Sequence, residues 1–582
     1  VGNNLVQLDP GASAVVTATL TSGTGNLVGS RTATAINGTA TFSDLGIAGS
    51  TSQTFTISYS ITTPVSISKA QASINLTHGD ANKLVATTEA SGAVNRIAFG
   101  VQPTVKIYDA YDNLVNTGSS AAATISVSAS AGAVLATNIT ETASAGSATF
   151  SGLKLSGAAG DYTLTYSSGN LTTDSQPLVL THGAATQLEI TRSASGFASD
   201  AAFSVQPKIT IQDADGNTVK TGAASTQNVV VSASSGTFSG TKSVPAVAGV
   251  ADFVDSGLSL KGAVGGYTLT YKVTSPVEIT KTQGITLAFG VATKLAITTQ
   301  ADGFVNREAF SVSPEVTVQD SFGNTVTSST ATIQIALTGA TLSSTASVDA
   351  VGGVATFSGL SKHGQVGSKT LTFTSTGLAP DSQTFQLTHG SPYQLETTTP
   401  AAGFTNGAVF GTQPKITILD RDGNPVETGA DAAQDVTVSA SGSAAFTGTK
   451  VVRSAAGIAD FAGKGLKLTG SATTYTLTFK ITSPSEISVA QGISLEAGPA
   501  TKLFVATPAA TAVNRAAFVV QPIIEVHDVS GNLVTTSTAL INVTANTAIV
   551  TGVHTQMNAV GGIANFANEP LGLQGTAGLI TL

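Results

Sequence analysis

The sequence contains no cysteine and no tryptophan, and it is poor in charged and aromatic side chains. Without cysteine there is no disulfide framework, but a chain of 582 residues is long enough for several domains that need none. Charged residues make up 10% of the sequence, against roughly 25% in ordinary soluble proteins. The net charge of −8 excludes the basic surface of a nucleic-acid-binding protein. The lack of tryptophan argues against stacking platforms for sugars.

Long hydrophobic runs are also missing, so the sequence predicts no membrane-spanning helix of about 20 apolar residues. The bulk of the chain is threonine, serine, alanine, glycine and valine. Threonine and valine favour pleated strands, and the 61 glycines suit many turns. Low charge promotes association. The composition therefore indicates an all-β protein whose surface is partly covered by neighbours.

One motif recurs five times: an aspartate, three residues, then asparagine, one residue and valine. The spacings between the aspartates are 104, 107, 100 and 108 residues. Such self-similarity at a fixed period is the signature of a tandem repeat. The aspartate and asparagine of each copy are Asp109 and Asn113, Asp213 and Asn217, Asp320 and Asn324, Asp420 and Asn424, and Asp528 and Asn532.

Other landmarks recur in order around this motif, and they divide the chain into six repeats. A Gln-Pro pair usually precedes the motif, a Gly-x-Ala-x-Phe segment and a Tyr-Thr-Leu-Thr-Tyr segment follow it, and Thr-His-Gly or its relic closes the repeat. The first repeat begins inside its own turn, at Asn3–Val6, and the last stops inside its Tyr-Thr-Leu strand. We therefore expect the intact protein to continue in both directions. The repeats are 1–79, 80–183, 184–290, 291–390, 391–498 and 499–582.

Each repeat has about seven short alternating runs separated by turn residues, which predicts an antiparallel β-sandwich. The fold class is thus an all-β linear array of immunoglobulin-like domains. Phe150 and its equivalents are expected in the core at a strand centre, and Tyr162, Leu164 and Tyr166 on one face of a strand. The repeated turn suits a hairpin in which glycine or asparagine takes positive φ.

A second sequence pattern alternates between the odd and the even repeats. Repeats 1, 3 and 5 share a longer ending around Pro64, Pro276 and Pro484, whereas repeats 2 and 4 end in Asp-Ser-Gln. Asn-Arg pairs recur near the start of the even repeats, as Asn95-Arg96, Asn306-Arg307 and Asn514-Arg515. These pairs are interpreted either as a linker turn or as a polar contact made only by the even domains.

The strand followed by Asp-x-x-Gly-Asn-x-Val, with the Gly-x-Ala-x-Phe strand behind it, resembles bacterial immunoglobulin-like repeats of the invasin and intimin type and the related filamin-like repeats. The resemblance covers essentially the whole chain. It implies a cell-surface or secreted location and a mechanical or adhesive role, but it does not separate stalks from lattice subunits, fibres or binding tips.

Two copies of the turn carry a second acid and are similar to the start of a calcium-binding loop. No bidentate acid follows at the required spacing, and the other copies lose the second acid. A hairpin turn is the favoured interpretation, with a weak Ca²⁺ site at a domain junction as the alternative. The candidate ligands are Asp213, Asp215 and Asn217 in repeat 3, and Asp420, Asp422 and Asn424 in repeat 5.

No catalytic constellation is visible. His78, His182 and His389 occupy one position in three repeats, without the converging partners of a metal site or a triad, and are interpreted as linker residues. We therefore predict a non-enzyme, with no cofactor apart from the weak calcium alternative. A third hypothesis, an accessory part of a secreted polysaccharide-degrading enzyme, finds no catalytic domain in these residues.

The predicted function is a structural subunit of an extracellular assembly, such as a surface layer, sheath or fibre. Its predicted partners are copies of itself, with the cell envelope or other cells as further candidates, and with no nucleic acid. The alternative is the stalk of a giant cell-surface adhesin. A stalk needs solubility more than lateral contact, so the low charge favours the assembly.

Overall fold

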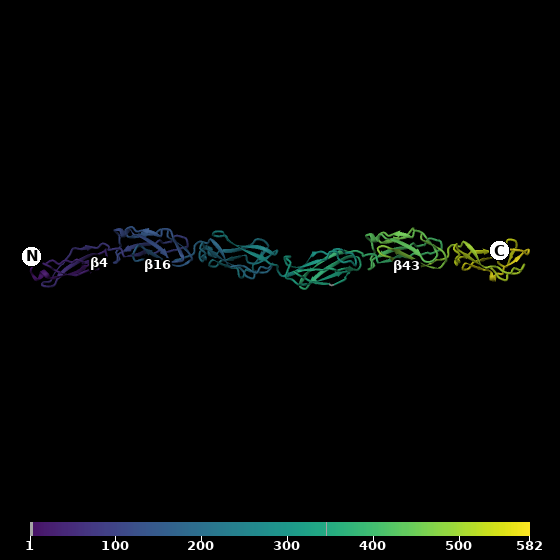
Figure 1. The fold of residues 1–582 in the computed structure, drawn as a ribbon, viewed down its shortest axis with the longest axis horizontal. Coiled ribbons are helices and arrows are strands. Elements are labelled where there is room, and N and C mark those ends of the chain that lie inside the picture. Colours follow the sequence, from purple (N-terminus) through teal and green to yellow (C-terminus); the bar gives the residue numbers. More distant parts are fainter. Residues whose placement is uncertain (1–3, 345) are drawn as a thin grey trace. The chain divides into compact units, whose positions relative to one another are not determined.

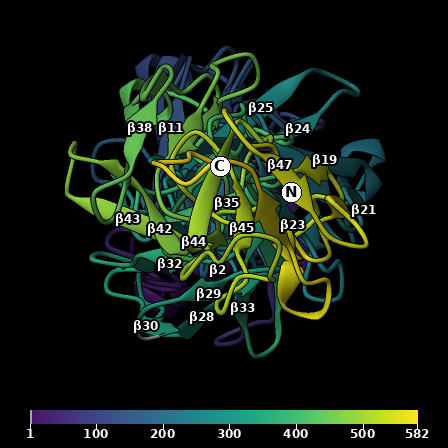
Figure 2. The same cartoon turned by 90° about the vertical axis from the view of Figure 1, so that its right-hand side faces the viewer.

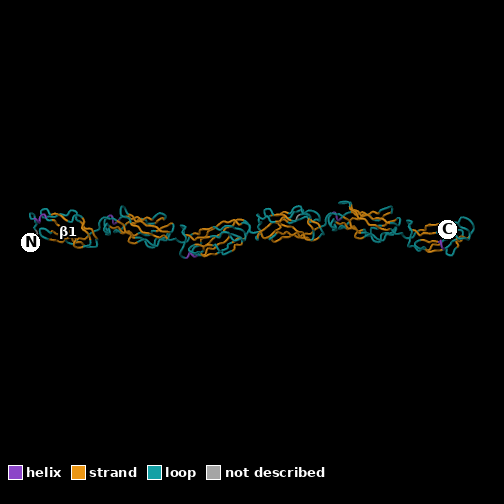
Figure 3. Tube along the Cα trace, turned by 90° about the horizontal axis from the view of Figure 1, so that it is seen from below, coloured by secondary structure: helices purple, strands orange, loops and turns teal. Residues whose placement is uncertain are grey.

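The computed structural model describes residues 4–344 and 346–582, and Asn3 of the predicted first turn lies outside this range. Strands make up 49% of the residues and helices 3%, and the helices are single 3₁₀ turns (Figure 3). The chain forms two compact units, 1–290 and 291–582. The strands of each unit are shown along the sequence in Figure 1 and from a second direction in Figure 2.

Within residues 4–290, three β-sandwiches follow the first three repeats. Repeat 1 contains η1 (Pro10–Ser13), β1 (Val15–Ser22), β2 (Gly25–Val28), β3 (Thr32–Thr34), β4 (Gly46–Gly49), β5 (Thr54–Ile61), β6 (Ile67–Ala70) and β7 (Ile74–Asn75). Repeat 2 contains β8 (Lys83–Thr88), β9 (Thr104–Tyr108), η2 (Ser119–Ala122), β10 (Thr124–Ala129), β11 (Ala133–Ala136), β12 (Thr140–Thr142), β13 (Ser147–Thr149), β14 (Lys154–Gly157), β15 (Gly160–Ser167) and β16 (Asp174–Leu180). Repeat 3 contains β17 (Gln187–Arg192), β18 (Lys208–Gln212), η3 (Ala223–Thr226), β19 (Asn228–Ala233), β20 (Thr237–Ser239), β21 (Ser243–Pro245), β22 (Val250–Asp252), β23 (Ser259–Lys261), β24 (Gly265–Val273) and β25 (Ile279–Leu287).

The second unit is built in the same way. Repeat 4 contains β26 (Ala292–Thr299), β27 (Glu315–Asp320), β28 (Thr332–Thr338), β29 (Thr341–Leu342), β30 (Ser347–Asp349), β31 (Val354–Thr356), β32 (Lys362–His363), β33 (Gly367–Ser375) and β34 (Leu378–Leu387). Repeat 5 contains β35 (Gln394–Thr399), β36 (Lys415–Leu419), η4 (Ala430–Ala432), β37 (Asp435–Ala440), β38 (Ala445–Thr447), β39 (Val451–Arg453), β40 (Ile458–Asp460), β41 (Lys467–Thr469), β42 (Thr474–Ile481) and β43 (Ile487–Ser494). Repeat 6 contains β44 (Lys502–Thr507), β45 (Ile523–His527), β46 (Leu540–Asn542), β47 (Ile549–Thr551), β48 (Gln556–Asn558), β49 (Ile563–Asn565), η5 (Phe566–Asn568) and β50 (Gly572–Gln574).

The sheet order is the same in the central repeats. In repeat 3 a three-stranded sheet, β17-β18-β22, faces a four-stranded sheet, β21-β19-β24-β25, and β20 pairs with β23. Every pair in these sheets is antiparallel. Repeat 5 repeats this arrangement with β35-β36-β40 and β39-β37-β42-β43. Repeat 4 departs from it at one point, where Lys294 of β26 bridges Ala379 of β34 in parallel and joins the two sheets.

Alternating side chains of both sheets fill each core. Tyr162, Leu164 and Tyr166 are all buried on one face of β15, as predicted. Phe150 and its equivalents are also buried, but the prediction of a strand centre was wrong, because Phe150 follows the last residue of β13. It is there that the chain turns inward, and the ring centroid of Phe150 lies 6.1 Å from that of Tyr166 in the opposite sheet.

The repeated Asp-Asn turn closes a short hairpin at one end of each sandwich. In repeat 5 the amide of Asp420 donates to the carbonyl of Asn424 at 2.8 Å, and Gly423 takes a φ of +79°. In repeat 2, which has no glycine there, Asp112 takes a φ of +64°. The prediction that glycine or asparagine takes positive φ is thus confirmed where the turn contains glycine, but it was wrong for repeat 2, in which an aspartate does so. The asparagine side chain is instead used at the domain junction.

Candidate interdomain site

The carboxylate of Asp420 organises its own turn. Its Oδ1 atom accepts hydrogen bonds from the amides of Asp422 and Asn424, both at 2.9 Å. Aspartate favours such turns because its short side chain can bond to backbone groups a few residues on. Only about 1% of the Asp420 surface is exposed, so these bonds replace the water that the carboxylate loses.

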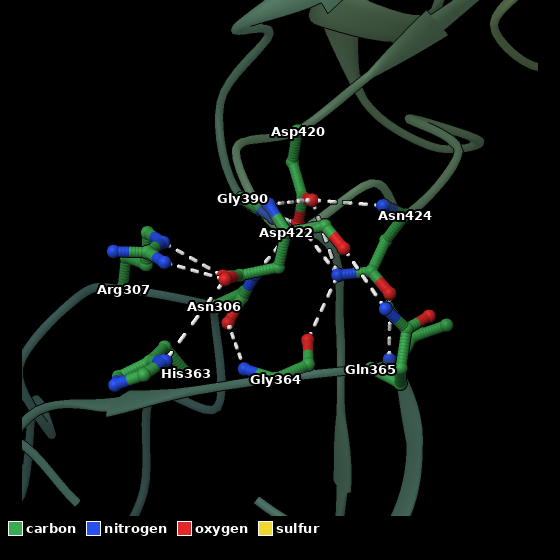
Figure 4. A network of polar contacts seen from close by, with 10 residues as sticks. Asn306, Arg307, His363, Gly364, Gln365, Gly390, Asp420, Asp422 and Asn424 are labelled. Carbon is green, nitrogen blue, oxygen red and sulfur yellow. Dashed lines mark hydrogen bonds and ion pairs between the residues drawn. The ribbon is translucent and has the colours of Figure 1, made fainter. Parts of the chain in front are cut away.

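The other oxygen of Asp420 binds the preceding domain and the linker. Oδ2 accepts from the Asn306 side chain of repeat 4 at 2.7 Å and from the amide of Gly390, the last residue of that repeat, at 2.9 Å. Asn306 is itself held, because its Oδ1 accepts from the amide of Gly364 at 3.0 Å. Figure 4 shows these groups converging on the two aspartates. One carboxylate thus connects turn, linker and neighbouring domain.

A charged pair lies beside this contact. The guanidinium of Arg307 donates to both oxygens of Asp422, from Nε at 2.7 Å and from a terminal nitrogen at 2.5 Å. This bidentate geometry matches the planar guanidinium to the carboxylate. The φ of Arg307 is +65°, so the backbone bends where its side chain leaves repeat 4. His363 completes the cluster, with its Nδ1 atom 3.9 Å from Asp422.

Asn424 makes the reciprocal bond back to repeat 4. Its side chain donates to the carbonyl of Gly364 at 2.9 Å and accepts from the amide of Val366 at 2.9 Å (Figure 4). Gln365 adds a bond to the carbonyl of Asp422 at 2.9 Å. We call the five side chains Asn306, Arg307, Asp420, Asp422 and Asn424 the clasp.

The junction between repeats 2 and 3 has the same clasp. Asn95 donates to Asp213 at 2.8 Å and to Asp215 at 2.7 Å. Arg96 donates to Asp215 through Nε at 2.7 Å and through a terminal nitrogen at 2.6 Å. Asn217 donates to the carbonyl of Gly157 in repeat 2 at 2.9 Å.

These contacts hold the carboxylates in their charged form. The hydrogen bonds from Arg96 lower the pKa of Asp215 to about 2, with further lowering from Asn95. Arg307 likewise lowers the pKa of Asp422. Burial works to raise the pKa of Asp420, but the hydrogen bonds from Gly390, Asn424 and Asn306 outweigh it, and that pKa lies below its ordinary value.

Two other junctions have a reduced contact. Between repeats 5 and 6, Asn406 donates to Asp528 at 2.6 Å, and Asn532 donates to the carbonyl of Gly470 at 2.8 Å. Gly407 and Ser530 stand where the clasp has its arginine and second aspartate. Between repeats 1 and 2, Asn113 donates to the carbonyl of Gly49 at 2.9 Å. The full clasp thus includes a charged pair that these junctions do not share.

The structure distinguishes the two interpretations of the Asn-Arg pairs, which were a linker turn and a polar contact made only by the even domains. Asn95-Arg96 and Asn306-Arg307 contact the next domain, so the interdomain interpretation is confirmed for these two pairs. The restriction to even domains was wrong for asparagine, because Asn406 of repeat 5 makes the same bond. The pairs come early in their repeats, yet the fold places them at the end that faces the following domain.

The calcium candidates lie in this network. In repeats 3 and 5 the carboxylate oxygens of Asp213, Asp215, Asp420 and Asp422 accept from N–H groups, and a guanidinium faces the second aspartate. Across residues 4–344 and 346–582, no group of three histidine or acidic side chains has the arrangement of a metal site. The carboxylate oxygens of the candidate ligands thus accept hydrogen bonds from N–H groups in this structure. In the remaining turns, Asp109, Asp320 and Asp528 accept from the amides of Asn113, Asn324 and Asn532.

The three predicted linker histidines each bridge the linker to a loop of the next repeat. The Nε2 atoms of His78, His182 and His389 lie 2.7, 2.9 and 2.8 Å from threonine hydroxyls. These threonines are Thr117, Thr221 and Thr428, each followed by a glycine and a 3₁₀ helix. Sequence reasoning missed them, although Val-x-Thr-Gly occurs in repeats 2, 3 and 5, the repeats that follow a histidine.

The chain is therefore a tandem array of immunoglobulin-like β-sandwiches, and within each of its two units polar contacts join successive domains. No protein-family model and no curated protein matches it. Invasin, described as a bacterial integrin-binding protein, is a similar solved structure, with 13% identity, 74% of this chain and 82% of invasin covered, and a TM-score of 0.25. The Escherichia coli adhesin FdeC has 15% identity, 53% and 95% coverage and a TM-score of 0.24. Domains 1–6 of the surface layer protein SbsC have 12% identity, 85% and 63% coverage and a TM-score of 0.18.

The described residues contain no helix with the length and apolar character needed to cross a membrane.

Proposed function

We propose that this chain is a non-catalytic structural subunit of an extracellular assembly, such as a surface layer, sheath or fibre. Copies of the chain would pack side by side through the outer faces of their four-stranded sheets. The clasps would hold successive domains in a fixed orientation, so that equivalent faces meet equivalent faces along the chain. The observation that carries this proposal is the uncharged middle of those outer faces, since the ion pairs on them lie at the strand ends.

In repeat 3 the outward side chains of β25 are Thr280, Thr282, Gly284 and Thr286, and all are exposed. The neighbouring strand β24 adds Thr268 and Thr270 beside them. Repeat 4 presents a comparable surface. Its exposed or half-buried outward residues are Gln334, Ala336, Ser368, Thr370, Thr372, Ser382, Thr384 and Gln386.

Both sheets carry ion pairs. On the three-stranded sheet of repeat 3, Asp252 of β22 pairs with Arg192 of β17 and with Lys208 of β18, the latter at 2.8 Å. On the four-stranded sheets the pairs lie at strand ends, and they are Lys272 with Glu278, Arg453 with Asp435 and Lys480 with Glu486. A free surface normally carries both signs of charge, so the uncharged middle of the four-stranded face is the part suited to burial against a neighbour.

The alternative is the stalk of a cell-surface adhesin, which would use the same junctions without lateral contacts. The clasp supports this alternative as well as the assembly, because either role needs domains that keep their relative orientation. The assembly and the stalk differ in the environment of the four-stranded faces, which would be buried against neighbours in the assembly and exposed to solvent in the stalk.

Sedimentation velocity and negative-stain electron microscopy of the full chain, over a range of concentrations, test the proposal. The assembly account predicts concentration-dependent association into ordered sheets or fibres. Thr163→Lys with Thr384→Lys places two charges on the four-stranded faces and should abolish association. The matched control is Thr149→Lys with Thr356→Lys, which places the same charges on exposed positions of the three-stranded sheets in the same repeats.

Isolated particles at every concentration would reject the assembly and favour the stalk. Equal loss of association in both variants would reject the four-stranded face as the contact, because the added charge would then act wherever it lies.

A further inference from the structure

The hydrogen-bond partners of two junction histidines, His182 and His389, dictate which ring nitrogen carries the hydrogen. The Nδ1 atom of His182 lies 2.9 Å from the carbonyl of Gly183. A carbonyl oxygen can only accept, so Nδ1 must carry the hydrogen. The Nε2 atom accepts from the backbone amide of Thr221 at 3.2 Å. An amide can only donate, so Nε2 must be without a hydrogen. The imidazole is therefore neutral, in its Nδ1–H tautomer.

His389 has the same environment. Its Nδ1 lies 3.0 Å from the carbonyl of Gly390, and its Nε2 accepts from the amide of Thr428 at 3.1 Å. His78 repeats two of these contacts, with Nδ1 2.8 Å from the carbonyl of Gly79 and Nε2 2.7 Å from the Thr117 hydroxyl. All three side chains lie in half-buried residues. This histidine contact recurs at three junctions, so it is a regular feature of the repeat.

The loop that receives the histidine is built for it. Thr117, Thr221 and Thr428 precede glycines with φ of +79°, +78° and +75°, and each glycine begins a 3₁₀ turn that buries an alanine in the core. Repeats 4 and 6 have Ser-Ser and Thr-Ser in place of Thr-Gly. At the ends of the repeats that precede them, Phe289 and Ala497 stand at the position of the histidine. Histidine and the Thr-Gly loop thus occur together or not at all.

We propose that these histidines are acid-released latches, which hold the linker onto the Thr-Gly loop of the next repeat at neutral pH and free it on acidification. Proton uptake at Nε2 removes the acceptor and turns an N–H toward the threonine amide. Histidine is the side chain that changes charge between about pH 5 and 8. The latch is therefore present above this range and lost as the pH falls through it.

Other ionisable groups near the latch do not replace the histidine as the switch. Asp213 accepts from Gly183 and Asp420 from Gly390, and hydrogen bonds keep the pKa of each carboxylate below its ordinary value. These two carboxylates therefore stay charged down to pH 5. Charged residues adjacent in the sequence are Lys220 beside Thr221, Glu427 beside Thr428 and Asp80 near His78, and Asp109 accepts from the amide of Gly79.

Residue-resolved hydrogen exchange on the full chain tests the latch within a single loop. After correction for the intrinsic rate, the protection of the Thr221 amide should fall about tenfold between pH 7.5 and pH 5, as expected for the loss of one hydrogen bond of about 1.4 kcal/mol. The amide of Asn217, which donates to Asp213 at 2.9 Å, should keep its protection. The amide of Ser537 in repeat 6, whose loop has no histidine, should not respond.

Two further measurements separate the latch from general loosening. In His182→Ala, Thr221 should be weakly protected at both pH values, while Thr428 keeps its response. In chain labelled with ¹⁵N-histidine, the nitrogen shifts should report the Nδ1–H tautomer for three of the histidines at pH 7.5. Unchanged protection of Thr221, an equal loss at Asn217, or a pH response that persists in His182→Ala would each overturn the proposal.

Discussion

Replacing Asp420 with asparagine should open the junction between repeats 4 and 5. The substitution keeps the shape of the side chain but turns one acceptor oxygen into an NH₂ donor. Oδ1 accepts from the amides of Asp422 and Asn424, and Oδ2 from Gly390 and Asn306. Whichever way the amide is turned, its NH₂ group therefore faces two N–H donors. No rotation of the side chain relieves the conflict.

The magnitude follows from the hydrogen bonds involved. Bonds to a charged acceptor contribute about 1.5–3 kcal/mol each, and an unsatisfied buried donor costs a further 1–3 kcal/mol or so. Because the linker and side chains can move toward water, we expect a net loss of about 2–4 kcal/mol. This corresponds to exchange that is about 30- to 1,000-fold faster at the amides of Gly390 and Asn424.

Residue-resolved hydrogen exchange suits this chain because a multidomain protein does not unfold in one step. The equivalent amide of Gly183, which donates to Asp213 at 2.8 Å, is an internal control and should not change. Glu427→Gln removes the same charge from an exposed position of repeat 5 and should leave Gly390 protected. If Gly390 exchanges at the same rate in Asp420→Asn and the unmodified chain, the clasp does not hold the linker.

Three further predictions concern the core, acid and calcium. Lys362 is fully buried where repeats 2, 3, 5 and 6 have a core leucine, and its ammonium donates to the carbonyls of Gly303 and Glu308; Lys362→Leu removes the cost of burying this charge, which exceeds the loss of the two hydrogen bonds, and should stabilise repeat 4 by about 1–2 kcal/mol, seen as slower exchange in β33, and a loss of protection there would contradict this. The pKa of Asp215 is about 2, below the ordinary value, so its bond to Arg96 contributes stability above about pH 4 that is lost as the pH falls through 2; exchange at the Asp215 amide should be constant, after intrinsic correction, from pH 7 to pH 5 and should become faster below about pH 4, and constant exchange down to pH 2 would contradict this. A chelator should leave the thermal unfolding curve unchanged, because N–H donors take the carboxylate oxygens of the turns, and a lower midpoint that calcium restores would revive the metal site.

Much of the fold followed from the sequence because its causes are local. The alternation around Tyr162 and Leu164 dictates which face of β15 is buried, and the repeated Asp-Asn turn ends a strand in every copy. The position of Phe150 was less accessible, since a side chain can enter the core just beyond a strand as well as within it. The residue with positive φ in the turn is the one directly before the asparagine, which is Asp112 in repeat 2 and Gly423 in repeat 5.

The clasp was only half visible from the sequence. Asn306 and Asp420 are 114 residues apart, and nothing in spacing alone shows that the start of one repeat folds to the end that meets the next. The recurrence of Asn-Arg in even repeats and of a second aspartate in the following odd repeats was the available signal. The histidine latch needed the same comparison, between the residue that closes one repeat and the loop of the next.

The most direct test of the account is the width of the distance distribution across one clasped junction. The absence of cysteine allows spin labels at Thr384→Cys and Ser488→Cys, exposed positions in repeats 4 and 5, with Ser347→Cys and Thr384→Cys as a pair within one repeat. Pulsed electron paramagnetic resonance at neutral pH should give a junction distribution nearly as narrow as that within the repeat, and Asn306→Ala with Arg307→Ala should broaden it. A junction distribution that is equally broad with and without the two side chains would contradict the clasp as the element that orients neighbouring domains.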